Sequence, residues 1–145
     1  MQTVSVTRTI DADRDAVEAA MLDVEPFMEA AGFDAVRLDG DALHIENGVG
    51  LATIELDLTI VDREGAVLAY VQDDGIFREM ETRYTVADTA DGVEVEATTT
   101  FAVDIDLVGM LLDATVIKRQ RRKELTAQFD YLDDLAPVGA SSAPN

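Results

Sequence analysis

Polar and apolar residues alternate along much of this chain, and a period of two predicts β-strands with one buried face. The first such run covers residues 3–10. Short strands are expected at 35–38 and 42–46, after which the dipeptide Asn47-Gly48 signals a hairpin turn. Longer runs predict the body of an antiparallel sheet, and they lie at residues 53–60, 66–72, 79–86 and 93–105.

Helical periodicity follows the first strand and returns at the end of the chain. Asp13 can cap a short helix that carries Val17 on its apolar face, and a second short helix has Pro26 near its first turn. Residues 107–135 repeat apolar side chains every three or four positions. This spacing predicts one amphipathic helix about 43 Å long.

The order of these elements predicts the fold class. One strand, two short helices, a series of strands and a long terminal helix indicate an α+β protein. We expect a curved antiparallel sheet wrapped around the C-terminal helix, with a cavity between them. Residues 1–136 form a single domain in this interpretation, and residues 137–145, which contain Pro, Gly and Ser, form a flexible tail.

The composition agrees with one globular domain in the cytoplasm. Hydrophobic residues make up 48% of the 145 positions, which permits a packed core, and the absence of Cys excludes disulfides and thiolate metal sites. No apolar run approaches the roughly 20 residues that a membrane-spanning helix needs. The first residues also lack the basic and apolar regions of a secretory signal. We therefore expect no membrane insertion.

The charge is strongly acidic and spread along the chain. Thirty Asp and Glu residues against 11 Lys and Arg give a formal net charge of −19. Many acids occupy outward strand positions, among them Glu55, Asp57, Glu94 and Glu96. Their mutual repulsion destabilises the fold unless salt screens it. Because the charge is diffuse, we favour the hypothesis of a halophilic protein over that of an acidic surface made for a basic partner.

Four parts of the sequence carry a resemblance to a known group of proteins. They are residues 4–12 running into the helix at 13–22, the short helix after Asp23-Val24-Glu25, the hairpin Asn47-Gly48-Val49-Gly50, and the basic stretch 118–123 followed by Phe129-Asp130-Tyr131-Leu132. In these parts the chain resembles the START/Bet v 1-like superfamily, within the broad SRPBCC or polyketide cyclase/dehydrase-like group. The resemblance implies a helix-grip fold and the binding of a small hydrophobic molecule.

The cavity between sheet and helix is therefore the expected ligand site. Arg121 interrupts the apolar stripe of the terminal helix, so it must reach solvent, pair with a carboxylate or hold a polar group of the ligand. We expect the protein to bind or carry a lipid, a quinone or a polyketide-like molecule, without a cofactor. The predicted lining residues come from the inward strand rows and the helix: Met80, Thr82, Tyr84, Thr99, Phe101, Ile117, Arg121 and Leu125.

Two other functions stay open, a cyclase or dehydratase that uses the same pocket and a protein-interaction module. The residues show no convincing catalytic set. His44, the sole histidine, is out of phase with Leu43 and Ile45 and is expected to face solvent without an orienting partner. Asp11-x-Asp13-x-Asp15 lacks the later Gly and Glu of a calcium-binding loop.

The basic residues gather at positions 118–123 of the terminal helix. Lys118 and Arg122 are a like-charge pair at i,i+4, which destabilises a helix, so we expect carboxylates on neighbouring strands to compensate them. An anionic partner is the weaker interpretation, because the rest of the chain is strongly acidic. No nucleic-acid partner is favoured, and the sequence leaves the oligomeric state open.

Overall fold

Seven strands form one antiparallel sheet in the part of the chain that the computed structural model describes, which comprises residues 1–49, 52–103 and 114–142. The elements follow one another in this order: β1 (Gln2–Ile10), α1 (Arg14–Leu22), α2 (Val24–Glu29), β2 (Ala35–Asp39), β3 (Ala42–Val49), β4 (Ala52–Ile60), β5 (Leu68–Asp74), β6 (Phe77–Thr89), β7 (Gly92–Val103) and α3 (Ala114–Ser142). None of the helices in these ranges combines the length and the apolar composition that crossing a bilayer requires.

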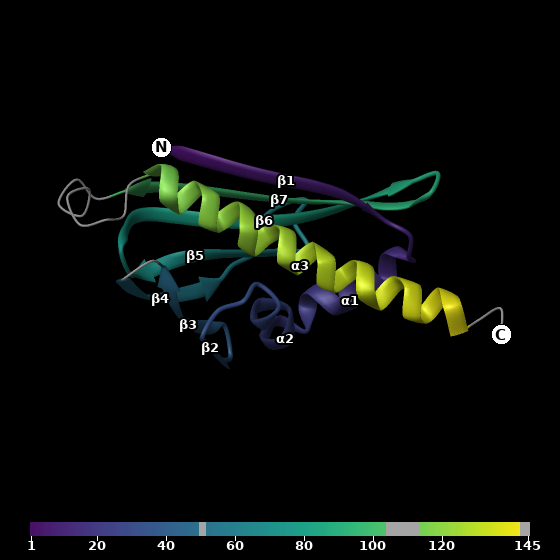
Figure 1. The fold of residues 1–145 in the computed structure, drawn as a ribbon, viewed down its shortest axis with the longest axis horizontal. Helices are drawn as coiled ribbons and strands as arrows, with labels where there is room; N and C mark the ends of the chain where they lie inside the picture. The colour runs from purple at the N-terminus through teal and green to yellow at the C-terminus, as the bar shows by residue number, and fades with distance from the viewer. Residues whose placement is uncertain (50–51, 104–113, 143–145) are drawn as a thin grey trace.

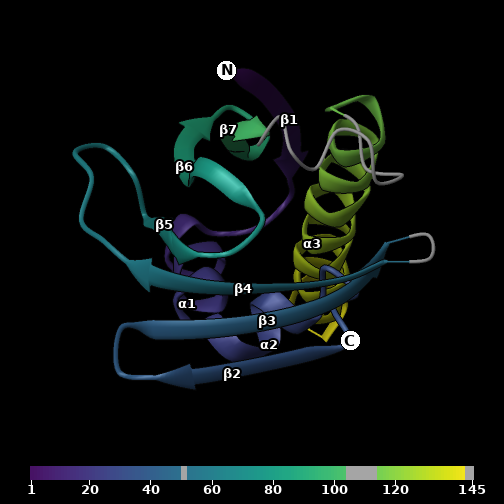
Figure 2. The same cartoon turned by 90° about the vertical axis from the view of Figure 1, so that its left-hand side faces the viewer.

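The sheet curves around the helices, as the order of elements predicts. Its strand order is β1-β7-β6-β5-β4-β3-β2, so β1 and β2 form the two edges. Figure 1 shows α3 running along β1 and across the sheet towards α1. Figure 2 shows the sheet bent so that β6 and β7 lie far from β2, β3 and β4, with α3 running beside both parts. The predicted helix-grip arrangement is confirmed.

The alternating pattern places apolar side chains on the inner face of this sheet. Outward positions such as Glu55, Asp57, Glu94 and Glu96 are exposed. The alternation at 79–86 and 93–105 predicts most of the inner rows of β6 and β7, although Val103 is only partly buried and residues 104–105 lie outside the described residues. The buried members of these rows are Met80, Thr82, Tyr84, Val86, Val93, Val95, Ala97, Thr99 and Phe101. These rows pack with the buried side of α3 into one hydrophobic core.

The predicted turn at Asn47-Gly48 is wrong. β3 continues through both residues, and its pairing with β4 extends to Val49 opposite Ala52. Asn47 is buried and its amide donates a hydrogen bond to Glu124 of α3. Strand pairing and this long-range contact outweigh the local turn preference of the dipeptide, so the connection lies between Val49 and Ala52.

Several element boundaries differ from those predicted, and β6 (Phe77–Thr89) extends beyond the predicted 79–86 at both ends. β5 spans Leu68–Asp74, two residues later than the predicted 66–72. The predicted start of the terminal helix at 107 lies outside the described residues, whereas its C-terminal end is at Ser142 and not at 135. Six residues of the predicted tail are thus helical in the structure, and the flexibility of 137–145 stays a prediction.

Candidate functional site

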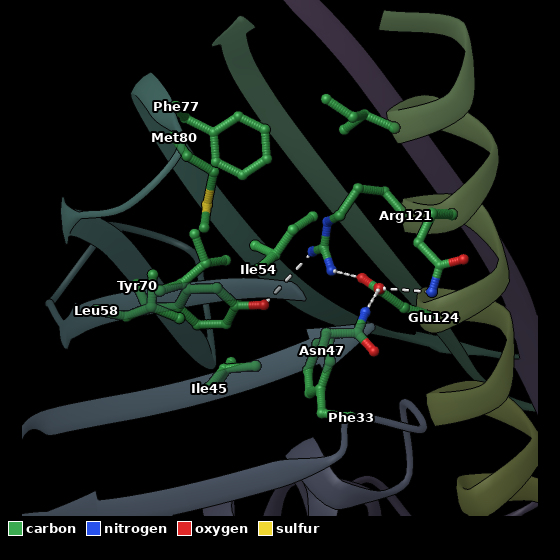
Figure 3. Close-up of a pocket in the computed structure, with 13 residues that line it drawn as sticks. Phe33, Ile45, Asn47, Ile54, Leu58, Tyr70, Phe77, Met80, Arg121 and Glu124 are labelled. Atoms are coloured by element: carbon green, nitrogen blue, oxygen red, sulfur yellow. Dashed lines mark hydrogen bonds and ion pairs between the residues drawn. The ribbon is translucent and has the colours of Figure 1, made fainter. Parts of the chain in front are cut away.

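A cavity lies between the inner face of β3–β6 and α3, and Figure 3 shows its walls. The centres of water-sized molecules can occupy about 40 Å³ of it, which is room for about three waters. Four polar side chains meet at its α3 side, namely Asn47, Gln120, Arg121 and Glu124, and Tyr70 of β5 directs its hydroxyl towards them from the sheet side. The other lining side chains are apolar: Phe33, Ile45, Ile54, Leu56, Leu58, Phe77, Met80 and Ile117.

Glu124 is the centre of the polar side of the cavity. Its carboxylate accepts hydrogen bonds from Arg121 Nη1 at 2.5 Å, Asn47 Nδ2 at 2.9 Å and Gln120 Nε2 at 3.0 Å. Gln120, Arg121 and Glu124 share one face of α3 because residues three and four apart are neighbours on a helix. Glu124 is only 3% exposed, so the three donors replace the water that a buried carboxylate loses.

Arg121 is buried beside Glu124 and reaches across the cavity towards the sheet. Its Nη2 donates to Thr82 Oγ1 at 3.3 Å and to Tyr70 Oη at 3.5 Å, while its Nε has no hydrogen-bond partner. Burial opposes the charge of the guanidinium, but Tyr70 and Glu124 outweigh it and raise the pKa of Arg121 above the ordinary arginine value. The side chain is therefore a charged donor, as its pairing with Glu124 requires.

A second buried polar chain lies behind the cavity wall. Tyr84 Oη donates to Gln128 Oε1 at 2.6 Å, and Gln128 Nε2 donates to the carbonyl of Phe27 at 3.2 Å. Burial, together with the neighbouring Tyr70, raises the pKa of Tyr84 well above its ordinary value, so the phenol stays protonated. These contacts join β6, α3 and α2, and they give Tyr84 a structural role.

The structure divides the eight predicted site residues into two groups. Met80, Ile117 and Arg121 line the cavity. The other five are buried in the core and do not line it: Thr82, Tyr84, Thr99, Phe101 and Leu125. Thr82 nevertheless accepts a hydrogen bond from Arg121 and donates one to Thr99 Oγ1 at 2.8 Å. It therefore helps to hold the Arg121 guanidinium in place without lining the cavity. Ligand contact by any of the eight stays a prediction.

Sequence reasoning missed Asn47, Gln120, Glu124 and Tyr70 as lining residues. One signal was available for Glu124, because a carboxylate three residues after Arg121 on a helix can pair with it. Asn47 was interpreted as a turn residue, and its partner lies 77 positions away in the chain. Such a contact is not visible in a local pattern.

His44 lies away from the cavity, on the outer face of the sheet, as predicted, but the prediction that it has no orienting partner is wrong, because Asp57 contacts its ring. Asp57 Oδ1 lies 2.7 Å from its Nδ1, and Glu46 and Glu55 lie 3.3 and 3.8 Å from its Nε2. Three of these groups, His44, Glu46 and Glu55, are close enough together to ligate one cation. The carboxylates, led by the hydrogen bond to Asp57, raise the pKa of His44, and a protonated His44 pairs with them directly.

The predicted compensation of the basic stretch by strand carboxylates is not seen among the described residues. Within them, no ion pair includes Lys118, Arg119, Arg122 or Lys123. Arg122 instead donates to the carbonyl of Ser5 on β1 at 3.2 Å. Arg8 of β1 pairs with Asp130 and Asp133 of α3.

The fold is similar to several solved structures at low sequence identity. A START superfamily protein from Mycobacterium smegmatis is 12% identical with a TM-score of 0.69, over 94% of this chain and 97% of that one. The ZhuI aromatase/cyclase from Streptomyces sp. R1128 is 16% identical with a TM-score of 0.72, over 91% and 93%. A protein from Thermus thermophilus is 15% identical with a TM-score of 0.73, over 92% and 95%.

Neither a protein-family model nor a curated protein sequence matches the chain. The structural matches cover nearly the whole chain and nearly the whole of each of these three neighbours, so the similarity concerns a complete domain. At 12–16% identity it establishes the fold alone. The chain has the START/Bet v 1-like fold, which is the fold that the resemblance of its sequence implies.

Proposed function

We propose that this protein binds or carries a small hydrophobic molecule, such as a lipid, a quinone or a polyketide-like compound, in the cavity between the sheet and α3. The observation that carries the proposal is the chemistry of the cavity walls. Eight apolar side chains surround the space, and the polar groups converge on one side of it. Ligand sites combine apolar walls with a few placed polar groups in this way.

The cavity is smaller than the ligands proposed for it, so its walls must move when a ligand enters. Phe33, Leu56 and Gln120 are only partly buried, and they lie where the cavity meets solvent. Met80 has a flexible side chain that can adopt another rotamer at low cost. A ligand that enters beside Phe33 and Leu56 can therefore extend the space along the apolar inner face of the sheet.

The first test is native mass spectrometry of protein purified from its own host under high salt, followed by extraction of bound molecules. A co-purifying lipid, quinone or polyketide-sized mass supports the proposal and gives the ligand class. A protein that carries no molecule is then titrated with the neutral fluorescent probe N-phenyl-1-naphthylamine. Absence of binding in both experiments contradicts the proposal.

A pair of variants tests whether the probe occupies this cavity. Ile54→Phe adds a ring to the wall and should weaken probe binding about tenfold or more, because the added atoms fill the space. Leu22→Phe changes a residue that is 56% exposed on α1 and should leave binding unchanged. Equal affinity of both variants for the probe would place the binding site elsewhere.

An enzyme of the cyclase or dehydratase class is the second candidate, since Glu124 and Tyr70 are ionisable groups at the cavity. Binding is favoured because the Glu124 carboxylate is already engaged by three donors. An interaction module is less well supported. Among the described residues, the large apolar side chains that are exposed are Met1 and Leu22, which do not form a docking patch.

A further inference from the structure

Arg121 Nε is a buried donor that the protein leaves without a partner. Among the described residues it is the one buried side-chain nitrogen or oxygen atom with no hydrogen bond. Arg121 is 8% exposed and lines the cavity, so bulk water does not solvate this group. A buried donor without a partner is costly, which indicates that something in the cavity accepts its hydrogen bond.

The shape of the guanidinium defines where that acceptor must lie. The group is planar, and its N–H donors form a fixed fork. Nη1 is directed to Glu124, whereas Nη2 makes only long contacts with Thr82 and Tyr70, at 3.3 and 3.5 Å. Nε–H and one N–H of Nη2 are parallel in a guanidinium. An oxygen atom placed between them can accept from both, whereas a carboxylate would use one oxygen for each.

The charges around Arg121 favour a neutral acceptor. Arg121 and Glu124 form a buried ion pair, so their charges compensate each other before any ligand binds. A ligand carboxylate would bring a second negative charge next to Glu124 in a region with little water, and such a charge is costly to bury without its own partner. A carbonyl oxygen accepts the same hydrogen bonds without adding a charge.

We propose that Arg121 selects ligands that carry a neutral carbonyl, as in a ketone, a quinone or an ester, over both carboxylates and plain hydrocarbons. This inference rests on the proposed function, because it assumes that a hydrophobic ligand occupies the cavity. It narrows that function by excluding ligands, such as free fatty acids, whose polar end is ionised. The apolar walls hold the body of the ligand, and Arg121 orients its carbonyl.

Three single-ring probes of nearly the same shape test the selection. Acetophenone has the carbonyl, α-methylstyrene has a methylene group in its place, and benzoate has a carboxylate. Each is titrated into the full chain at constant salt, with dissociation constants taken from methyl shifts of Ile54, Ile117 and Met80. We expect acetophenone to bind about tenfold tighter or more than either analogue, the range of one hydrogen bond to a charged donor.

The NMR signal of Arg121 Nε–H gives a direct second measurement. It should shift on addition of acetophenone and stay in place with α-methylstyrene. Equal affinity for these two probes would overturn the inference while leaving the proposed function intact, and it would mean that Nε is satisfied by an ordered water only. Tighter binding of benzoate would also overturn it. Failure of all three probes to bind to a protein that binds N-phenyl-1-naphthylamine would overturn the inference alone, whereas the proposed function is contradicted only if that probe and native mass spectrometry also show no binding.

Arg121→Lys separates the hydrogen bond from the charge. Lys keeps a positive partner for Glu124 but has no Nε–H and no planar fork of donors. The affinity of this variant for acetophenone should therefore fall to about its affinity for α-methylstyrene. Arg119→Lys is the matched control, because Arg119 is exposed on the same helix and does not line the cavity. If Arg121→Lys does not fold, the three probes on the wild-type protein still decide the question.

Discussion

Arg121 and Glu124 depend on each other, because each would be an uncompensated buried charge alone. Their nitrogen and oxygen atoms lie 2.5 Å apart, and both side chains are at most 10% exposed. A buried ion pair adds little stability compared with apolar residues of the same size, but loss of one partner is strongly destabilising. The main effect of the pair is therefore to fix the positions of the polar groups at the cavity, and its net contribution to the stability of the fold is small.

Replacement of Glu124 tests this dependence. Glu124→Leu should reduce the free energy of unfolding by about 3–5 kcal/mol, because it leaves Arg121 buried without its partner. Denaturant unfolding followed by circular dichroism gives the value. The double variant with Arg121→Met should recover much of the loss, and Lys123→Ala, at an exposed neighbour, should change stability by no more than about 0.5 kcal/mol. Equal loss in the single and double variants would contradict this account.

His44 gives a pH dependence at the residue scale. Asp57 and Glu46 raise its pKa, while Arg37 on β2 lowers it by a smaller amount. A pKa that is higher in the folded state stabilises the fold. That contribution is fully present below the ordinary histidine pKa of about 6.5, and it is lost as the pH rises through the folded-state pKa.

An NMR titration should give a His44 pKa above the ordinary value. Asp57→Asn should lower this pKa, because it removes the strongest interaction that favours the charged ring. Asp73→Asn is the matched control, since Asp73 accepts a hydrogen bond from Thr59 and not from His44. An unshifted pKa in the wild-type protein, or equal effects of the two variants, would rule out the role of Asp57.

At the scale of elements, α3 is held to the sheet by ion pairs at its exposed side, and by apolar packing and buried hydrogen bonds at its inner side. Arg8 on β1 pairs with Asp130 and Asp133, at 2.7 and 2.9 Å. Gln128 connects the same helix to Tyr84 on β6 and to the backbone of α2. These contacts hold α3 in the position that places Gln120, Arg121 and Glu124 over the cavity.

The turn between β6 and β7 depends on Gly92. Its φ is +143°, and a Cβ there would lie 2.2 Å from the carbonyl oxygen of Ile10, which is backbone and cannot move away easily. Gly92→Ala should therefore destabilise the protein by about 2 kcal/mol or more, measured by thermal or denaturant unfolding. Gly40→Asn is the control, because its φ of +62° suits Asn and no atom lies within 4 Å. Equal stability of the two variants would disagree with this account.

At the scale of the whole molecule, the charge of −19 makes stability depend on salt. Repulsion between exposed carboxylates is screened over about 10 Å at 0.1 M salt and about 3 Å at 1 M. The melting temperature should therefore rise by about 5 °C or more between 0.1 and 2 M KCl. A variant with Glu55, Asp57, Glu94 and Glu96 changed to amides should show a smaller rise. If the melting temperature of this variant rose as much as that of the wild-type protein, the salt effect would come from general salting-out and not from charge screening.

Much of the architecture could be predicted from local patterns. The alternation in β4, β6 and β7 identified the buried rows. In an antiparallel strand with one solvent-exposed face, apolar and polar side chains alternate every two residues. The boundaries were less predictable. The Asn47-Gly48 turn signal was overridden by strand pairing, and Pro137 did not end α3, whose helical backbone extends to Ser142.

The sequence by itself determined which face of β4, β6, β7 and α3 is buried, since that information lies in residues two, three or four positions apart. It also placed Arg121 on a buried stripe. Only the tertiary structure decided that Arg121 pairs with Glu124, that Asn47 and Tyr70 join them, and that Nε stays free at the cavity. These contacts join residues as far as 77 positions apart, so they depend on how the sheet bends around α3 and not on any local repeat.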